Sequence, residues 1–305
     1  MVKDLLMTGN IAATEQSSVR YRGLDEWSSA AILDALWEGQ LAAIAAVQQA
    51  LPDIAAAADA CVAQLNRGGR LVYAGAGTSG RIGVQDGAEL SPTFNWPRSR
   101  LVLLMAGGDQ ALTHAVENAE DDVAAGRRAI ADHAIGENDA VIGIAASGST
   151  PFTLACLKAA DTAGACTVAV ANSAGGAILH AARWPILVPT GAEVIAGSTR
   201  MKAGTAQKAV LNLLSSLVMV RLGHVHDGLM VDMVASNEKL RRRAERMLHD
   251  ITGAARSSIQ EALAATGGRV KPAVLVIHGL AADEAEAALA RHAGNLRATL
   301  ASLRI

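Results

Sequence analysis

The segment Leu71-Val-Tyr-Ala-Gly-Ala-Gly-Thr-Ser-Gly-Arg81 joins an apolar run to a turn that contains three glycines. The run Leu71–Ala74 is typical of a buried β-strand, and the glycines allow a sharp turn after it. We expect Ser79 to cap a helix that runs towards Glu89, with Pro92 ending it soon afterwards. Free N–H groups and the positive end of a helix dipole attract anions at such a turn. The segment therefore predicts a phosphate site.

Strands and helices alternate through the middle of the chain, which predicts an α/β fold with a doubly wound parallel sheet covered on both faces. Further strands are expected at Leu101–Met105, Ala140–Ala145, Cys166–Ala171 and Ile186–Val188. Helices are expected over Leu24–Leu51, over the segment that Asp53 caps, and after Asp109, Thr150 and Arg200. Beyond Asn237 the pattern is helical. We expect an arm and helix over residues 1–50, a sheet domain over 51–236 and a small helical C-terminal subdomain over 237–305.

Composition excludes several classes of protein. The chain has 305 residues, of which 51% are hydrophobic and 3% aromatic, as in a helix-rich α/β protein. A formal net charge of −2 gives no general attraction to nucleic acid or to an anionic membrane. The three cysteines do not indicate a disulfide framework. The N-terminus has no signal-peptide pattern, and the apolar segment Ala209–Leu222 is too short to span a bilayer. We expect a cytoplasmic protein without nucleic-acid or membrane partners.

The first glycine turn also matches the dinucleotide-binding pattern G-x-G-x-x-G. That fold requires an acidic residue at the end of the next strand, to bind the ribose hydroxyls. Here the next strand ends Met105-Ala-Gly-Gly108, and Asp109 is expected to cap a helix. The pattern therefore disfavours a nucleotide cofactor.

A second hydroxyl-rich turn, Ala146-Ser-Gly-Ser-Thr-Pro151, follows another expected strand. Helix capping by Ser149 or Thr150 explains such a turn taken alone. Two such turns at the carboxyl ends of parallel strands, however, lie at the edge where open α/β sheets bind ligands. A ligand with one phosphate and several hydroxyls would use both turns.

Other polar groups give weaker signals. His224, His226 and Asp227 stand on an expected turn, where such side chains are more often surface polar groups than metal ligands. There is no convincing third ligand, so we expect no metal site. The arginines that follow Asn237 are expected to form a solvated face. Lys202 stands in the first turn of a helix, where the dipole disfavours a cation. It is therefore either a contact to a ligand or partner, or a surface lysine.

Three motifs, Gly75–Arg81, Gly143–Gly148 and Gly197–Lys208, resemble those of the N-acetylmuramic acid 6-phosphate etherases, which belong to the sugar-isomerase (SIS) fold group. Leu229–Asp232 and Ser236–Leu240 continue the resemblance. It implies cleavage of the D-lactyl ether of N-acetylmuramic acid 6-phosphate, giving N-acetylglucosamine 6-phosphate and D-lactate. It also implies that no metal or nucleotide cofactor takes part, and that active sites lie near the interface of a homodimer.

The resemblance places two catalytic carboxylates at Glu89 and Glu120, both of which we expect late in helices. From the residues alone, each is better explained as a surface carboxylate. The expected substrate- and phosphate-binding residues are Gly77, Thr78, Ser79, Gly80, Arg81, Ser147, Gly148, Ser149, Thr150, Glu193, Ser198 and Lys202.

The chain departs from the etherase pattern in the second turn, where Ser149 and Phe152 replace Arg and Tyr, and at Asn172-Ser173-Ala174, where Asn-Pro-Gly is usual. We expect these changes at the rim of the sugar site, where they bear on the identity of the sugar. Two alternatives stay open: a sugar-phosphate isomerase of the same fold, and a non-catalytic sensor of sugar phosphates. Retention of Glu89 and Glu120 argues against the sensor.

Overall fold

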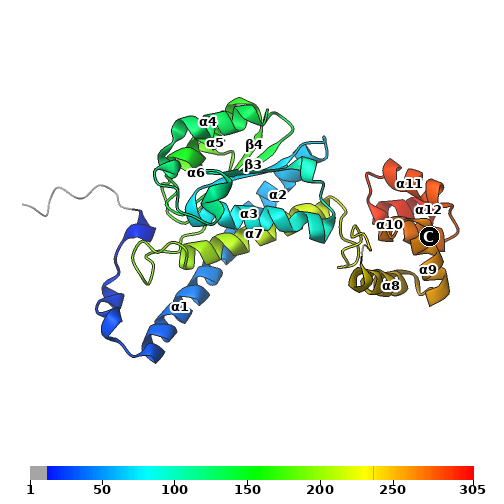
Figure 1. Ribbon diagram of the computed structural model, residues 1–305, viewed down its shortest axis with the longest axis horizontal. Coiled ribbons are helices and arrows are strands. Elements are labelled where there is room, and N and C mark those ends of the chain that lie inside the picture. Colours follow the sequence, from blue (N-terminus) through cyan, green and yellow to red (C-terminus); the bar gives the residue numbers. More distant parts are fainter. Residues whose placement is uncertain (1–11, 236) are drawn as a thin grey trace, which may run out of the picture. The chain divides into compact units, whose positions relative to one another are not determined.

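A computed structural model describes residues 12–235 and 237–305 (Figure 1). Their contacts group them into two units, the first made of residues up to Gly87 together with Ser99–Ser215. The second unit comprises Ala88–Arg98 and Ser216–Ile305. The division at residues 51 and 237 stays a prediction.

Five parallel strands form the sheet of the first unit, in the order β2-β1-β3-β4-β5. They are β1 (Leu71–Gly75), β2 (Leu101–Met105), β3 (Ala140–Ala145), β4 (Cys166–Ala171) and β5 (Trp184–Leu187). Because β1, β3 and β4 are buried along their whole length, helices must cover both faces. Helices α4, α5 and α6 lie on one face, and α2, α3 and α7 on the other (Figure 1). The predicted doubly wound parallel sheet is confirmed.

The helices connect the strands and build the C-terminal region. The α-helices are α1 (Ser29–Val47), α2 (Leu51–Leu65), α3 (Gly77–Phe94), α4 (Val123–Asp132), α5 (Pro151–Thr162), α6 (Ala177–Ala181), α7 (Lys202–Arg221), α8 (Glu238–Thr252), α9 (Arg256–Ala265), α10 (Val270–Ile277), α11 (Ala282–Arg291) and α12 (Leu296–Leu303). The short 3-10 helices are η1 (Ala13–Glu15), η2 (Val19–Tyr21), η3 (Leu24–Glu26), η4 (Gln48–Ala50), η5 (Arg98–Arg100), η6 (Asp109–Leu112) and η7 (Ala119–Asp121).

The first long helix is shorter than expected. It begins after Ser28, whose Oγ accepts the N–H of Ala31 at 3.2 Å, and η3 precedes it as a separate turn. Pro52 does not interrupt a helix, because it stands in the first turn of α2, where its missing N–H has no helical partner to lose. The turn η4 therefore joins α1 almost directly to α2.

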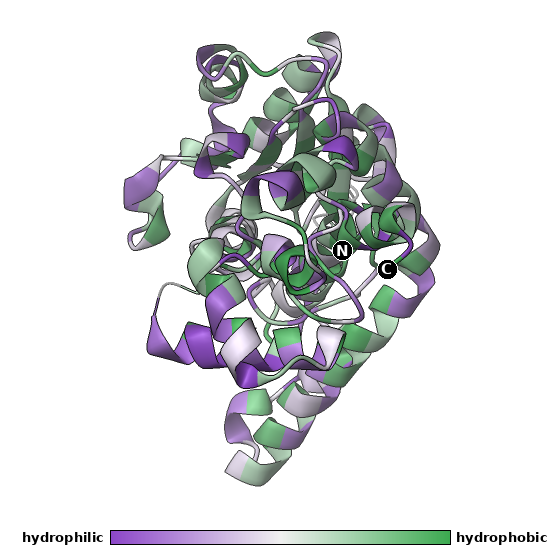
Figure 2. Cartoon of the chain, turned by 90° about the vertical axis from the view of Figure 1, so that its right-hand side faces the viewer, coloured by the Kyte–Doolittle hydropathy of each residue, from purple (hydrophilic) through white to green (hydrophobic). Residues whose placement is uncertain are grey.

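Helix α1 buries small side chains and exposes large ones. Its buried residues are Ala35, Gly39, Ala43 and Val47. On the exposed side, Leu33, Trp37, Leu41 and Ile44 are 65, 63, 52 and 50% accessible. Hydrophobic residues occur along the length of this helix (Figure 2). By length and composition alone, the run Ser29–Leu65 is also apolar enough to cross a membrane. Within the described residues, the stripe formed by Leu33, Trp37, Leu41 and Ile44 therefore stays largely uncovered.

The N-terminal end of β1 is fastened by a buried carboxylate. Asp139 accepts hydrogen bonds from the backbone N–H of Arg70 at 2.8 Å and from its Nε and Nη2 at 3.1 and 2.7 Å. The N–H of Gly136 donates to the same carboxylate at 3.0 Å. Burial by itself raises the pKa of Asp139, but these hydrogen bonds outweigh it and hold the pKa below its usual range.

The second unit is helical, as predicted. Helices α8 to α12 enclose a core that includes Met247, Leu248 and Val274. Within this unit, Lys271 Nζ lies 2.6 Å from Asp232 Oδ2, which ties α10 to the segment before α8. His224 Nδ1 lies 2.5 Å from the same oxygen. This part of the chain therefore has its own core and its own partly buried ion pair.

Replacing Asp139 with Asn should lower the free energy of unfolding by about 2 kcal/mol near neutral pH, because several charge-assisted hydrogen bonds are weakened. A carboxyl whose pKa is lowered by folding stabilises the protein above its unfolded pKa, and loses that effect as the pH falls through the folded pKa. The difference between wild type and Asp139→Asn should therefore shrink below about pH 4. Denaturant unfolding at several pH values measures it. Asp132→Asn, at an exposed position, is the control. Equal losses in both variants would contradict this role for Asp139.

Candidate functional site

The first glycine turn is tighter than expected. Helix α3 begins at Gly77, so only Ala76 separates it from β1. Ser79 therefore lies inside the first helical turn and is not the N-cap that we expected. The first N–H groups of a helix have no partner within it, so those of α3 are available at the carboxyl end of β1. This arrangement supports anion binding at the turn more directly than a capped loop would.

Glycine at two positions makes this tight junction possible. A Cβ atom built on Gly75 would lie 2.8 Å from Gly80 Cα, and one built on Gly80 would lie 2.4 Å from Met105 Sδ. Both distances are shorter than side chains tolerate, so the helix packs against the strand backbone to backbone. Any larger residue at either position would push the N-terminus of α3 away from the sheet edge.

The second hydroxyl turn follows β3, the neighbour of β1, so the two turns leave the same edge of the sheet side by side. Thr150 stands at the N-cap of α5, but its side chain makes no capping hydrogen bond. Ser147 Oγ accepts from the N–H and the hydroxyl of Ser149 at 3.3 and 3.1 Å. Gly148, with φ of 74°, packs against Gly176. Helix capping therefore does not explain why a residue with a hydroxyl group stands at position 150.

A hollow of about 260 Å³ at this edge brings together three of the predicted site residues. Gly77 and Arg81 line it from α3, and Glu120 lines it from the loop that follows β2. Ser149 lines a different hollow, of about 620 Å³, between α4 and α5. The structure thus joins the first turn to Glu120, and places Ser149 in a separate hollow.

Glu120 does not lie late in a helix, contrary to our expectation. It belongs to η7, which Asn118 begins with a positive φ of 59°. Asp122 then caps α4, accepting the N–H of Ala125 at 2.7 Å, so the regular helix starts only after Glu120. Glu120 is exposed and, in the described part of the chain, bonds to no other side chain. Its carboxylate is therefore available to a ligand.

Glu89 lies on α3, as expected, and is exposed. It follows Gly77 by twelve residues, which at 1.5 Å per residue is about 18 Å along the helix axis. It does not line the hollow that contains Glu120. Three residues earlier, the buried Asp86 accepts hydrogen bonds from Tyr73 Oη at 2.8 Å and Asn212 Nδ2 at 2.7 Å. This network holds α3 between β1 and α7, and the motif Asp86-Gly-Ala-Glu89 did not reveal it.

A buried carboxylate in the segment before α7 binds the N-terminus of that helix. Glu193 is fully buried and accepts the N–H groups of Lys202 and Ala203, both at 2.9 Å. A carboxylate at a helix N-terminus offsets the positive dipole, which explains how Lys202 is tolerated there. Lys202 is 8% exposed and its Nζ donates to the carbonyl of Ala192 at 2.9 Å; burial lowers its pKa, against the opposing effect of Glu193. Both side chains bond to backbone groups within the protein, and their expected contact with the substrate stays a prediction.

The first turn of α7 nevertheless lies beside the anion turn. A Cβ atom built on Gly204 would lie 3.5 Å from Thr78 Cγ2 and from Ile82 Cδ1, so α7 passes close to the start of α3. Ser198, half-buried, precedes this contact by a few residues. The third motif is thus brought to the same edge of the sheet as the first.

The departure at Asn172-Ser173-Ala174 begins inside the protein, although Ala174 is exposed. Asn172 is 1% and Ser173 2% exposed. Asn172 Nδ2 donates to the carbonyl of Val188 at 3.1 Å, and its Oδ1 accepts from Gln207 Nε2 at 2.9 Å. Ser173 Oγ lies 3.3 Å from the hydroxyl of the buried Thr14. These contacts attach the N-terminal arm and α7 to the end of β4. Asn172 and Ser173 are therefore buried, whereas we expected them at the rim of the sugar site.

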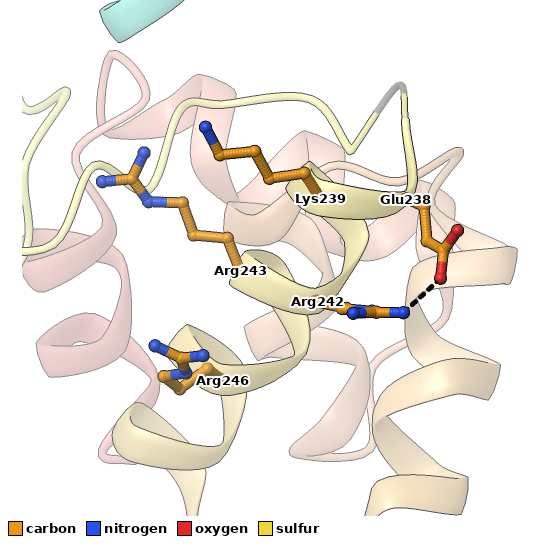
Figure 3. A pocket seen from close by; sticks show the side chains of 5 residues that line it. All are labelled: Glu238, Lys239, Arg242, Arg243 and Arg246. Carbon is orange, nitrogen blue, oxygen red and sulfur yellow. Dashed lines mark hydrogen bonds and ion pairs between the residues drawn. The ribbon is translucent and has the colours of Figure 1, made fainter.

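A second group of polar residues gathers on α8. Lys239, Arg243 and Arg246 line a hollow of about 710 Å³ together with Arg242, which pairs with Glu238 (Figure 3). The hollow is lined by charged side chains of one exposed helix face, in agreement with the solvated face that we expected. Within residues 12–235 and 237–305, no three His, Cys, Asp or Glu side chains are grouped as metal ligands.

Several known proteins are similar to this chain. Residues 53–161 match the family described as glucokinase regulatory protein N-terminal SIS domain. A phosphoheptose isomerase structure from Francisella tularensis covers 64% of this chain and 100% of its own, with 21% identity and a TM-score of 0.48. The N-acetylmuramic acid 6-phosphate etherase of Streptomyces coelicolor is 47% identical over 259 residues, or 85% of this chain and 83% of the relative. That of Deinococcus radiodurans is 50% identical over 288 residues, or 94% of each chain. With half of its residues identical over nearly its whole length, the chain belongs to the N-acetylmuramic acid 6-phosphate etherase family.

Proposed function

We propose that this protein cleaves the D-lactyl ether of N-acetylmuramic acid 6-phosphate and releases N-acetylglucosamine 6-phosphate and D-lactate. The observation that carries the proposal is the hollow shared by Glu120 and the N-terminal turn of α3. One end of it can bind an anion and the other supplies a carboxylate for proton transfer. The names of the similar etherases identify the sugar.

The chemistry explains why carboxylates are needed. An ether oxygen is a poor leaving group, so direct hydrolysis at neutral pH is slow. When the sugar ring opens, the C1 aldehyde acidifies the C2 proton. A base removes this proton, a C2–C3 double bond forms, and the C3–O bond breaks as an acid protonates the departing lactate. Water then adds at C3 and a proton returns to C2, so two carboxylates in different surroundings suffice.

The described residues fit these roles in the following way. The sugar phosphate binds the first N–H groups of α3, with the hydroxyls of Thr78, Ser147 and Thr150 as further donors. Glu120 and Glu89 exchange the protons at C2 and at the leaving oxygen. We place the reaction in the cytoplasm, where it recycles an amino sugar from the cell wall.

Glu89→Gln and Glu120→Gln should each lower kcat about 100-fold or more, because an amide cannot accept or donate the proton. KM should change little, since neither side chain binds the phosphate. The assay is D-lactate release from N-acetylmuramic acid 6-phosphate. In deuterated water the product should carry deuterium at C2, because the proton there is exchanged with solvent.

The same assay separates the alternatives. An isomerase would convert an aldose phosphate to a ketose without releasing lactate, and a sensor would bind the sugar without turnover. Either result with the wild type would overturn the proposal. A product free of deuterium at C2 would exclude the elimination route, and a wild-type rate in either Gln variant would remove that carboxylate from the mechanism.

We further propose that the protein is a homodimer in which each active site takes residues from both chains. The exposed stripe Leu33, Trp37, Leu41 and Ile44 on α1 recurs every three or four residues, as in a helix that packs against another helix. A second copy of this chain presents the same stripe, and a twofold interface pairs identical surfaces. The length of α3 separates Glu89 from Gly77 of its own chain, which favours its use by the partner.

Mixing Glu89→Gln and Glu120→Gln subunits should restore activity, because each mixed dimer then contains one intact site. Random mixing should recover about a quarter of the wild-type rate, since half of the dimers are mixed and one of their two sites is intact. Subunits are exchanged by co-expression, and activity is compared with that of each variant alone. Light scattering that shows only monomer would contradict the dimer. A dimer without restored activity would assign both carboxylates to one chain.

A further inference from the structure

Arg81 contacts the loop that carries Glu120. Its Nε donates to the carbonyl of Ala111 at 2.9 Å, and its Nη2 donates to the carbonyl of His114 at 3.1 Å. Arg81 itself stands in the second turn of α3, directly after the anion turn. One side chain therefore joins the phosphate-binding end of α3 to the backbone that leads to Glu120.

Packing holds the two ends of this loop, because Ala111 is buried and Ala119, next to Glu120, packs against the core of the first unit. The middle of the loop has few attachments apart from Arg81. In the described part of the chain, the remaining hydrogen bonds of residues 109–122 join residues at most four positions apart. Residues 112–118 are exposed, so burial does little to fix them. Val116 provides one packing contact, because a Cβ atom built on Gly107 would lie 2.9 Å from its Cβ. The ends of the loop are therefore held by packing, whereas local hydrogen bonds alone do not fix residues 112–118 relative to α3.

We propose that Arg81 is a positioning residue, which locates Glu120 relative to the bound phosphate by holding residues 111–114 against α3. The inference rests on the proposed function, since it assigns Glu120 a proton-transfer role. A displacement of about 1 Å between reacting groups costs up to about 100-fold in rate. A guanidinium fixed by two carbonyls supplies this accuracy, because its donors form a rigid planar fork.

Lysine cannot reproduce the contact. Its single ammonium nitrogen lacks the planar fork that spans the carbonyls of Ala111 and His114. Arg81→Lys keeps the positive charge beside the anion turn but loses the two-point attachment, whereas Arg81→Met loses both. The pair of variants therefore separates a positioning role from electrostatic binding of the phosphate.

Arg81→Lys should lower kcat for lactate release by about 10- to 100-fold, with little change in KM or in inhibition by inorganic phosphate. Arg81→Met should lower kcat at least as far. Arg67→Met is the control, because Arg67 is exposed and its Nη1 bonds only to the side chain of Gln64, one helical turn away. If Arg81→Lys kept the wild-type kcat, or if Arg81→Met raised KM and weakened phosphate inhibition at unchanged kcat, Arg81 would be a phosphate ligand and the inference would be wrong.

Hydrogen–deuterium exchange tests the attachment without relying on activity. In ligand-free protein, the amides of residues 109–122 should exchange at least about tenfold faster in both Arg81 variants than in wild type, while β1 and β3 stay protected. Unchanged exchange in that loop would overturn the inference. A wild type that releases no lactate but shows faster loop exchange in the variants would refute the proposed function and leave the attachment by Arg81 established.

Discussion

The close contact between Gly75 and Gly80 is the constraint on which the site depends. It lets α3 begin one residue after β1, so that its unpaired N–H groups stand at the edge of the sheet. A side chain at either glycine would separate helix and strand, because the next atoms are backbone or the sulfur of Met105. The proposed phosphate site is therefore a consequence of backbone packing, and in this proposal the side chains around it determine which sugar phosphate binds and how it reacts.

Other elements of the first unit place functional groups next to the N-terminus of α3. The loop after β2 carries Glu120 and is held by Arg81, while the loop after β3 adds hydroxyl groups beside the turn. Helix α7 lies close to the turn at Gly204, near Thr78, and the buried Glu193 offsets the positive end of that helix. In the proposed mechanism, substrate binding and proton transfer thus rely on different elements, which meet at the carboxyl ends of neighbouring strands.

Periodicity and glycine spacing were sufficient to predict the sheet. The ranges of β2, β3 and β4 agree with the prediction, because each is a continuous apolar run bounded by turn residues. Predictions from local sequence patterns were wrong where tertiary contacts determine the structure. The helix expected after Asp109 is the short turn η6, and Glu120 lies before a helix because Asp122, not Asp109, caps the regular one. Glu193 and Arg81 were expected to contact the ligand, but the hydrogen bonds that the structure gives them are to backbone groups. Those of Glu193 lie nine and ten residues away and those of Arg81 30 and 33 residues away, and residue spacing reveals neither set.

The central claim is that the N-terminal turn of α3 binds the sugar phosphate beside Glu120. A crystal structure of the Glu120→Gln variant with N-acetylmuramic acid 6-phosphate tests it most directly, because the variant should bind substrate without consuming it. The account predicts phosphate oxygens within about 3 Å of the backbone nitrogens of Thr78 and Ser79, and C2 or C3 of the sugar beside residue 120. A phosphate bound instead by the arginines of α8, or in the hollow between α4 and α5, would contradict it.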